Sequence, residues 1–141
     1  PRLTKYGVYD EKRGMPILTK LIRELSIYPP DPLRTVANLS GGNQQKVLLA
    51  KWMACDPKVL ILDEPTRGVD IGAKLIIHQS IERLAAEGLT VILISSDLPE
   101  LVALSNRVMI MRQGHFIREM VKTECSEESI LLAANGEGLE S

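Results

Sequence analysis

Two adjacent carboxylates, Asp63 and Glu64, follow an apolar run within the stretch KVLILDEPTRGVD, residues 58–70. The run is short and bounded by turn residues, which predicts a buried strand of a parallel sheet. Ligands of open α/β sheets bind outside the carboxyl ends of the strands, where this pair would lie. One carboxylate could hold Mg²⁺, directly or through water, and the other could orient and deprotonate a water that attacks a γ-phosphate. The alternative is an acidic helix start that only complements the helix dipole.

A second candidate for chemistry is the upstream stretch LSGGNQQK, which ends at Lys46. Its composition predicts a helix behind the glycines, and a helix N-terminus offers unpaired N–H groups and a partial positive charge to an anion. Gly41 and Gly42 would let the backbone approach a phosphate closely, and the Ser40 hydroxyl adds a donor. The alternative is a plain Ser-Gly-Gly helix entry. No G-x-x-x-x-G-K-[ST] motif occurs in the sequence, and Lys46 does not complete one.

These residues need elements to hold them, and hydrophobic spacing predicts alternating helices and strands. Expected helices cover 16–27 (with Pro16 in the first turn), 43–54, 72–87, 98–104 and 126–134, and expected strands cover 58–62, 90–94 and 108–111, followed by an edge hairpin over 115–120. Residues 1–15 are expected to be a loop or arm, and 135–141 a frayed tail. The alternation implies βαβ crossovers and a parallel sheet. About three core strands are few for such a sheet, so an apolar sheet face should be uncovered.

Composition excludes several classes of function. The chain has 141 residues, a net charge of −1 and 4% aromatic residues, which argues against nucleic acid as a partner. Cys55 and Cys125 lie far apart, and His78 and His115 are equally isolated, so a zinc or iron site held by this chain is not expected. No apolar run approaches the ~20 residues that span a bilayer.

The two motifs together resemble a known family. LSGGNQQKV, followed after about a dozen residues by LILDEPTRGVD, resembles the signature motif, Walker B and D-loop of ABC-type ATPases. With ISSDLPE and RVMIMRQG, the wording is similar to the second nucleotide-binding domain of the ATPases that import ribose, galactose, xylose and related sugars, in which two ATPase domains lie in one chain. The resemblance covers about residues 17–136 and is closest over 38–114.

The resemblance implies an α/β fold: an incomplete P-loop NTPase (ABC ATPase) core, with a parallel sheet flanked by helices, plus part of the ABC helical subdomain. Residues 1–38 would be the end of the helical subdomain and a linker. Residues 39–120 would be the C-terminal part of the ATPase core, with signature, Walker B, D-loop and switch region. Residues 121–141 would be a C-terminal helix and tail.

The resemblance also implies roles for individual residues. The signature loop would contact, in trans, the γ-phosphate of an ATP held by the opposite domain; its residues are Ser40, Gly41, Gly42, Asn43 and Gln44. Asp63 would be the Mg²⁺-associated Walker B aspartate, acting through water, and Glu64 the catalytic glutamate. Asp70 would be the D-loop aspartate at the domain interface, with an exposed turn as the alternative. Ser96 occupies the switch position, where most such ATPases have a histidine; serine can donate to phosphate but carries no mobile proton near neutral pH.

The function implied is that of an ATP-binding subunit of a monosaccharide importer, of which this chain would be a fragment. The parent would be an ATPase that uses ATP and Mg²⁺. Its implied partners are the first nucleotide-binding domain, transmembrane permease subunits and, indirectly, a sugar-binding protein, at the cytoplasmic face of the plasma membrane. Two alternatives stay open: an ABC-type ATPase outside transport, and a non-catalytic interaction module.

The missing phosphate-binding lysine generates a first prediction. Because the sequence contains no G-x-x-x-x-G-K-[ST] motif, neither ATP nor Mg²⁺ should bind tightly to this chain alone, and the chain should be inactive as an ATPase. Isothermal calorimetry with Mg-ATP should detect no binding. Micromolar affinity would contradict the interpretation.

Overall fold

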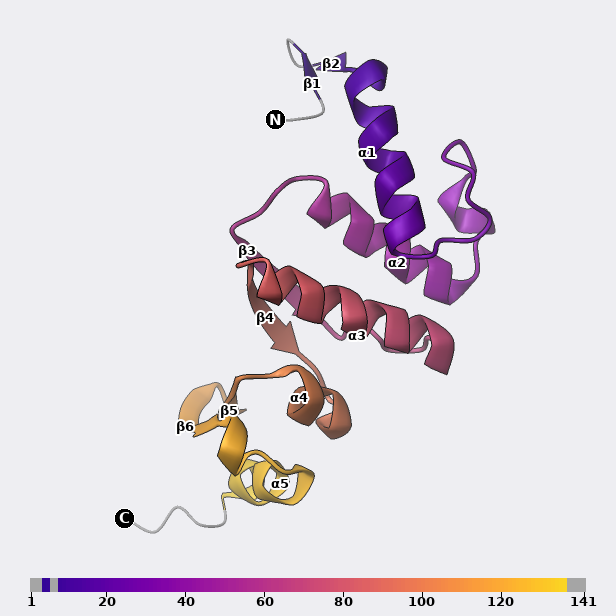
Figure 1. The fold of residues 1–141 in the computed structure, drawn as a ribbon. Helices are drawn as coiled ribbons and strands as arrows, with labels where there is room; N and C mark the ends of the chain where they lie inside the picture. The colour runs from indigo at the N-terminus through magenta and orange to yellow at the C-terminus, as the bar shows by residue number, and fades with distance from the viewer. Residues whose placement is uncertain (1–3, 6–7, 137–141) are drawn as a thin grey trace. The chain divides into compact units, whose positions relative to one another are not determined.

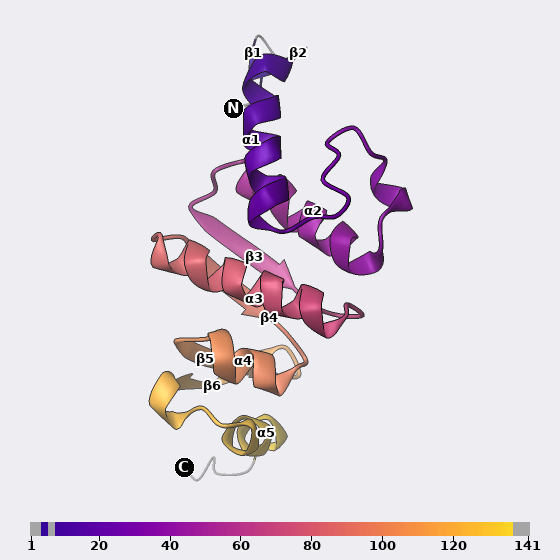
Figure 2. The same cartoon turned by 45° about the vertical axis from the view of Figure 1, so that its right-hand side comes forward.

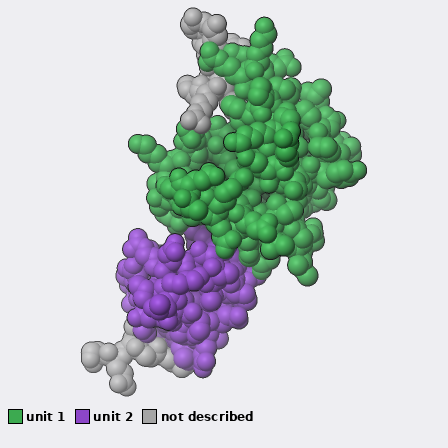
Figure 3. All heavy atoms as spheres, viewed as in Figure 1, with its two compact units in different colours: residues 1–92 green, residues 93–141 purple. Residues whose placement is uncertain are grey.

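The computed structural model describes residues 4–5 and 8–136. The chain divides into two compact units, residues 1–92 and 93–141 (Figure 3). Residues 137–141 of the expected frayed tail lie outside the described part, whereas Asn135 is the last residue of a helix. Within the described ranges, none of the helices has the length and apolar character that crossing a bilayer requires. The domain limits implied by the family resemblance stay a prediction.

The first unit begins with a short hairpin and continues as alternating helices and strands (Figure 1). Its elements are β1 (Thr4–Lys5), β2 (Val8–Tyr9), α1 (Glu11–Glu24), a 3-10 turn (Val36–Asn38), α2 (Gly41–Met53), β3 (Val59–Asp63) and α3 (Ile71–Ala86). β4 (Thr90–Ile94) leads into the second unit, which holds α4 (Leu98–Leu104), β5 (Arg107–Arg112), β6 (His115–Val121), a 3-10 turn (Lys122–Glu124) and α5 (Glu127–Asn135). Helices α2 to α5 match the predicted ranges to within about two residues.

The start of α1 differs from the sequence prediction. The helix begins at Glu11 rather than at Pro16, so residues 11–15, expected to be part of an arm, are helical and Pro16 lies inside the helix. The acidic start explains this extension, because Glu11 complements the positive end of the helix dipole. An ion pair of 3.3 Å between Asp10 and Arg13 also spans the first turn. Pro16 removes one intrahelical hydrogen bond in the second turn of α1, and the helix continues through it.

The helices of the first unit form a stack that ends on a small sheet. α1 contacts α2, and α2 contacts α3. α3 lies across β3 and β4, which form a two-stranded parallel sheet (Figures 1 and 2). Leu60 and Leu62 of β3 are buried, whereas the alternate side chains of Val59 and Ile61 are 51% and 62% exposed. One face of this sheet is therefore covered and the other presents apolar side chains to solvent.

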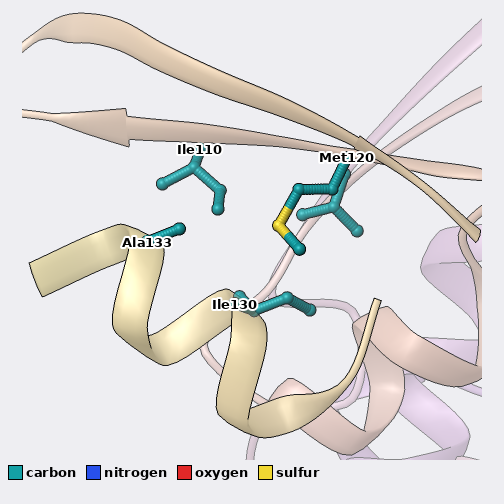
Figure 4. Close-up of a cluster of buried hydrophobic side chains, with 5 residues drawn as sticks. Ile110, Met120, Ile130 and Ala133 are labelled. Atoms are coloured by element: carbon teal, nitrogen blue, oxygen red, sulfur yellow. The ribbon is translucent and has the colours of Figure 1, made fainter. Parts of the chain in front are cut away.

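The second unit is a hairpin packed on a helix. β5 and β6 pair in antiparallel fashion, and the turn residues Gln113 and Gly114 both have positive φ, of 50° and 79°. Figure 4 shows side chains of the hairpin pointing toward α5, in a buried cluster of Val108, Ile110, Met120, Ile130 and Ala133. The predicted edge hairpin is confirmed. Among the described residues, β3 pairs with β4 alone, whereas β5, the expected third strand, pairs with β6.

The uncovered sheet face generates a prediction about association. Because Val59 and Ile61 are more than half exposed on one face of β3, the 15.6 kDa chain should self-associate in solution. Sedimentation equilibrium should give an average mass above that of the monomer, and the double variant Val59→Thr/Ile61→Thr, which keeps β-branched side chains in the strand, should lower it. A stable monomer at all concentrations would contradict this expectation.

Candidate functional site

The N-terminus of α2 forms an exposed, positively polarised end. Ser40 is the N-cap residue, with extended backbone, and Gly41 is the first residue of the helix; both are exposed. The Ser40 hydroxyl accepts no hydrogen bond from a backbone N–H of the first turn, although capping such a group is the usual use of a serine there. The backbone N–H groups of the first turn lack intrahelical partners. Ser40 and Gly41 thus lie at the surface at the positive end of the helix dipole.

The two glycines of this loop have different environments. A Cβ at Gly42 would lie 2.7 Å from the Cβ of Ala73 and 3.1 Å from Asp70 Oδ2, whereas a Cβ at Gly41 would meet nothing within 4 Å. The sequence predicted one role for both glycines, which was to let the backbone approach a phosphate closely. In the structure, the space that Gly42 leaves is used by α3. Gly42 thus allows α2 and α3 to touch, and Gly41 alone faces open space.

Asp70 connects this helix contact to the following loop. It is the N-cap of α3, and its Oδ1 accepts a hydrogen bond of 2.9 Å from the Ala73 N–H. Asp70 is exposed as a residue, yet its carboxylate is held beside Gly42. The predicted D-loop and the predicted signature loop are therefore brought together in the first unit, with Asp70 between them.

The side chains of Asn43 and Gln44 bond to the loop that precedes α2. Asn43 Nδ2 donates to Ser40 Oγ at 2.9 Å, and Asn43 Oδ1 accepts from the Tyr28 N–H at 2.9 Å. Gln44 Nε2 donates to the Leu39 carbonyl at 3.0 Å. In this structure, the side-chain amides of Asn43 and Gln44 stabilise the loop that precedes α2 through these hydrogen bonds.

A groove lies beside the N-terminal half of α2. It has a volume of about 280 Å³ and is lined by Gly41, Gln44 and Leu48 of α2 and by residues 67–69 of the loop after β3. The exposed side chain of Arg67 adds a positive charge at this surface. The groove therefore adjoins the polarised end of α2 on the side of the predicted D-loop.

The two carboxylates stand where the sequence predicted them, at the end of β3. Asp63 is the last residue of the strand and is exposed. Glu64 is half-buried and has a φ of 48°, in the left-handed region that costs a non-glycine residue about 1–3 kcal/mol. The Glu64 carbonyl accepts from the Arg67 N–H at 3.2 Å, which closes a turn toward the D-loop. Glu64 is thus the position at which the chain leaves the sheet.

Ser96 lies in the second unit, where its neighbours form a buried network. The Ser95 hydroxyl donates to Glu100 Oε2 at 2.5 Å and accepts from the Asp97 N–H at 3.1 Å. Asp97 Oδ1 caps α4 by accepting from the Glu100 N–H at 3.0 Å. The Glu100 side chain is only 1% exposed. This network fixes the residues on either side of the predicted switch position.

Sequence reasoning missed two structural residues near the site. Lys46 is 6% exposed, and its Nζ donates to the Ser26 carbonyl at 3.2 Å. The signal was present in its spacing, since Lys46 follows the buried Gly42 by one helical turn and precedes the buried Leu49 and Ala50. Glu100 was also missed, although S/D-x-x-E before an apolar run is a helix-start pattern.

The chain is similar in sequence to known proteins. Residues 8–67 match the family model described as "ABC transporter". The chain is 47% identical over 133 residues to the ribose import ATP-binding protein RbsA of Streptococcus agalactiae, and 44% identical over 135 residues to the xylose import ATP-binding protein XylG of Thermoanaerobacter pseudethanolicus. These matches cover 94% and 96% of this chain but 27% of each relative, so the chain spans about a quarter of their length.

A solved structure supports the same fold. The dimeric post-hydrolysis state of the ATP-binding cassette MJ0796, bound to ADP and Pi, superposes with a TM-score of 0.73 at 22% identity. The superposition covers 84% of this chain and 51% of that chain. At this level of identity the likeness concerns the fold alone.

The contrast between the glycines generates a stability prediction. Gly42→Ala should lower the free energy of unfolding by about 1–3 kcal/mol, because its Cβ would force α2 away from Ala73. Gly41→Ala is the matched control and should leave stability unchanged or raise it by up to about 1 kcal/mol, since the site is open and alanine favours helix. Urea unfolding followed by circular dichroism measures both. Equal effects at the two positions would contradict the packing argument.

Proposed function

The chain belongs to the ABC transporter family, and from this premise we propose that it is the C-terminal part of an ATP-binding subunit of a monosaccharide importer. The parent protein hydrolyses ATP, and the loop at the start of α2 completes an ATP site whose phosphate-binding loop belongs to another ATPase domain. The 141 residues contain no G-x-x-x-x-G-K-[ST] motif. The phosphate that faces this loop is then held by a partner domain.

One observation carries the proposal: the N-terminus of α2 is exposed, polarised and held against the D-loop. Ser40 and Gly41 lie at the surface, whereas Gly42 is buried against α3 beside Asp70. Donors fixed in this way act on developing charge without reorganisation, and each typically contributes about 10²–10³ in rate. The arrangement suits a group supplied in trans, by the same logic as an arginine finger.

Asp63 fits a role in binding Mg²⁺. Among the residues that the structure describes, no group of three or more metal-ligating side chains comes together. Mg²⁺ sites in nucleotide enzymes use one or two carboxylates, with phosphates and waters as the other ligands. One exposed carboxylate at the end of β3 therefore matches such a site, in which the cation would neutralise charge on the β- and γ-phosphate oxygens.

In this proposal, Glu64 has a role at the chain's own, second ATP site, and Ser96 has a role in binding phosphate. Glu64 would hold the attacking water, at the position where a left-handed backbone takes the chain out of β3. Ser96 would donate a hydrogen bond to phosphate without transferring a proton. We therefore propose that the second site is slow and that the signature loop serves a faster site on the partner domain.

The sugar class and the partners follow from the relatives as proposals. The relatives that cover most of this chain are named as ribose and xylose import ATP-binding proteins. We propose that the parent protein energises uptake of a monosaccharide, docks on permease subunits at the cytoplasmic face of the membrane and receives sugar from a separate binding protein. Its two ATPase domains would close on each other with ATP between them.

The surface position of Gly41 allows a test of the phosphate contact. In the full-length protein, Gly41→Asp should reduce ATPase kcat about 100-fold or more, because a carboxylate at the helix end repels the γ-phosphate. An aspartate in the first turn also favours the helix, so folding is preserved. The neutral variant Gly41→Asn is the matched control and should lose much less activity. Equal losses would indicate a steric effect and count against the phosphate role.

The proposed ranking of the two ATP sites can be measured independently. Glu64→Gln keeps the shape of the side chain but removes the base, and it should lower the ATPase kcat of the full-length protein less than tenfold, because the second site contributes little to turnover. Steady-state phosphate release measures the effect. A loss as large as that of Gly41→Asp would mean that the second site hydrolyses ATP at the main rate.

A further inference from the structure

The side-chain amide of Asn43 makes one hydrogen bond through its oxygen and one through its nitrogen, and the first bond determines which atom takes part in the second. A backbone N–H can only donate, so the Asn43 atom that faces the Tyr28 N–H at 2.9 Å is the carbonyl oxygen Oδ1. The other end of the amide is then the NH₂ group, which donates to Ser40 Oγ at 2.9 Å. The orientation of this amide is therefore dictated by a main-chain group 15 residues upstream.

The same bond fixes the state of the Ser40 hydroxyl. A hydroxyl has one proton to donate and lone pairs that accept. Because Ser40 Oγ accepts from Asn43 and caps no N–H of α2, its own proton is directed to another partner. Ser40 is exposed at the polarised end of the helix, where an anion would be that partner. An amide turned the other way would instead attract the hydroxyl proton inward.

The anchor of this arrangement is the segment that leaves α1. Ser26 has a left-handed backbone, with φ of 47°, and its carbonyl accepts from the buried Lys46 ammonium one helical turn beyond Asn43. The positive charge of Lys46 lies near the negative end of the α1 dipole. Leu25 and Ile27 on either side are buried. The segment that carries Tyr28 is therefore bonded to α2 at two residues, Asn43 and Lys46.

We propose that Asn43 is a positioning residue that orients the Ser40 hydroxyl as a donor to the γ-phosphate. The Tyr28 N–H fixes the orientation of the Asn43 amide, and Lys46 holds the segment that carries Tyr28. We call this set of hydrogen bonds, from Tyr28 through Asn43 to Ser40, the relay. The inference rests on the proposed function and adds to it a cause for the donor state of Ser40. It also assigns different roles within the loop. Ser40 and the α2 N–H groups contact phosphate, whereas Asn43 acts on phosphate only through Ser40.

The first experiment examines the relay in the chain itself, without ATP. Amide hydrogen exchange of Tyr28 is measured by NMR or by mass spectrometry in the unsubstituted chain, in Asn43→Leu and in Asn43→Asp. Leucine removes the acceptor and should speed Tyr28 exchange about tenfold or more. Aspartate keeps an acceptor of the same shape and should retain protection. Equal Tyr28 exchange in the unsubstituted chain and in Asn43→Leu would overturn the relay.

The second experiment is a double-mutant cycle in the full-length ATPase. Asn43→Asp leaves an acceptor beside Ser40, so the hydroxyl proton turns inward, and kcat should fall about ten- to 100-fold while the KM for ATP changes less than about threefold. In a Ser40→Ala background the same substitution should have little further effect, because the group it acts through is gone. A simple repulsion of phosphate by the new charge would persist in that background.

The outcomes separate the two proposals. Additive effects of Asn43→Asp and Ser40→Ala would overturn the positioning role while leaving the ATPase proposal standing. A full-length protein without any ATPase activity would overturn the proposed function, and with it the phosphate end of the relay.

Lys46→Met should reproduce the fall in kcat, and Lys46→Arg, which keeps a donor for the Ser26 carbonyl, should restore it to within about threefold. If Lys46→Met lowers kcat and Lys46→Arg does not restore it, Lys46 has no part in the relay.

Discussion

The close approach of α2 to α3 at Gly42 is the constraint on which the rest of the site depends. A Cβ there would lie 2.7 Å from that of Ala73, so only glycine lets the two helices meet. The contact brings the first turn of α2 beside Asp70, the N-cap of α3. The N-terminal half of α2 and residues 67–69, which precede α3, line one groove. Gly41, which has open space around it, can face a ligand because its neighbour carries the packing.

Polar groups inside the first unit then fix the shape of this surface. Lys46 is a charged residue in a nearly buried position, which proteins tolerate when the charge is paired. Its bond to the Ser26 carbonyl and the bond from the Tyr28 N–H to Asn43 both join the end of α1 to α2. A displacement of α1 would therefore act directly on the loop that carries Ser40.

The regular elements were predictable because their signals are local. Apolar spacing in α3 and a left-handed glycine behind it, Gly88 with φ of 95°, fixed that helix almost to the residue. The turn at Gln113–Gly114 predicted the β5–β6 hairpin for the same reason. The prediction was wrong at α1, where Pro16 was given the role of a first-turn residue. The acidic residues before it start the helix earlier, and proline is tolerated inside.

The sequence by itself determined the chemistry: which residues form the motifs, that no phosphate-binding lysine motif is present, and that carboxylates follow a short apolar strand. Residue type and spacing carry this information, because they set charge, backbone freedom and helix or strand periodicity. Only the tertiary structure decided which glycine packs and which is open, and that the amide of Asn43 points its NH₂ group at Ser40. Those properties depend on Ala73 and Tyr28, which are distant in sequence and reach the loop only after α1, α2 and α3 have packed.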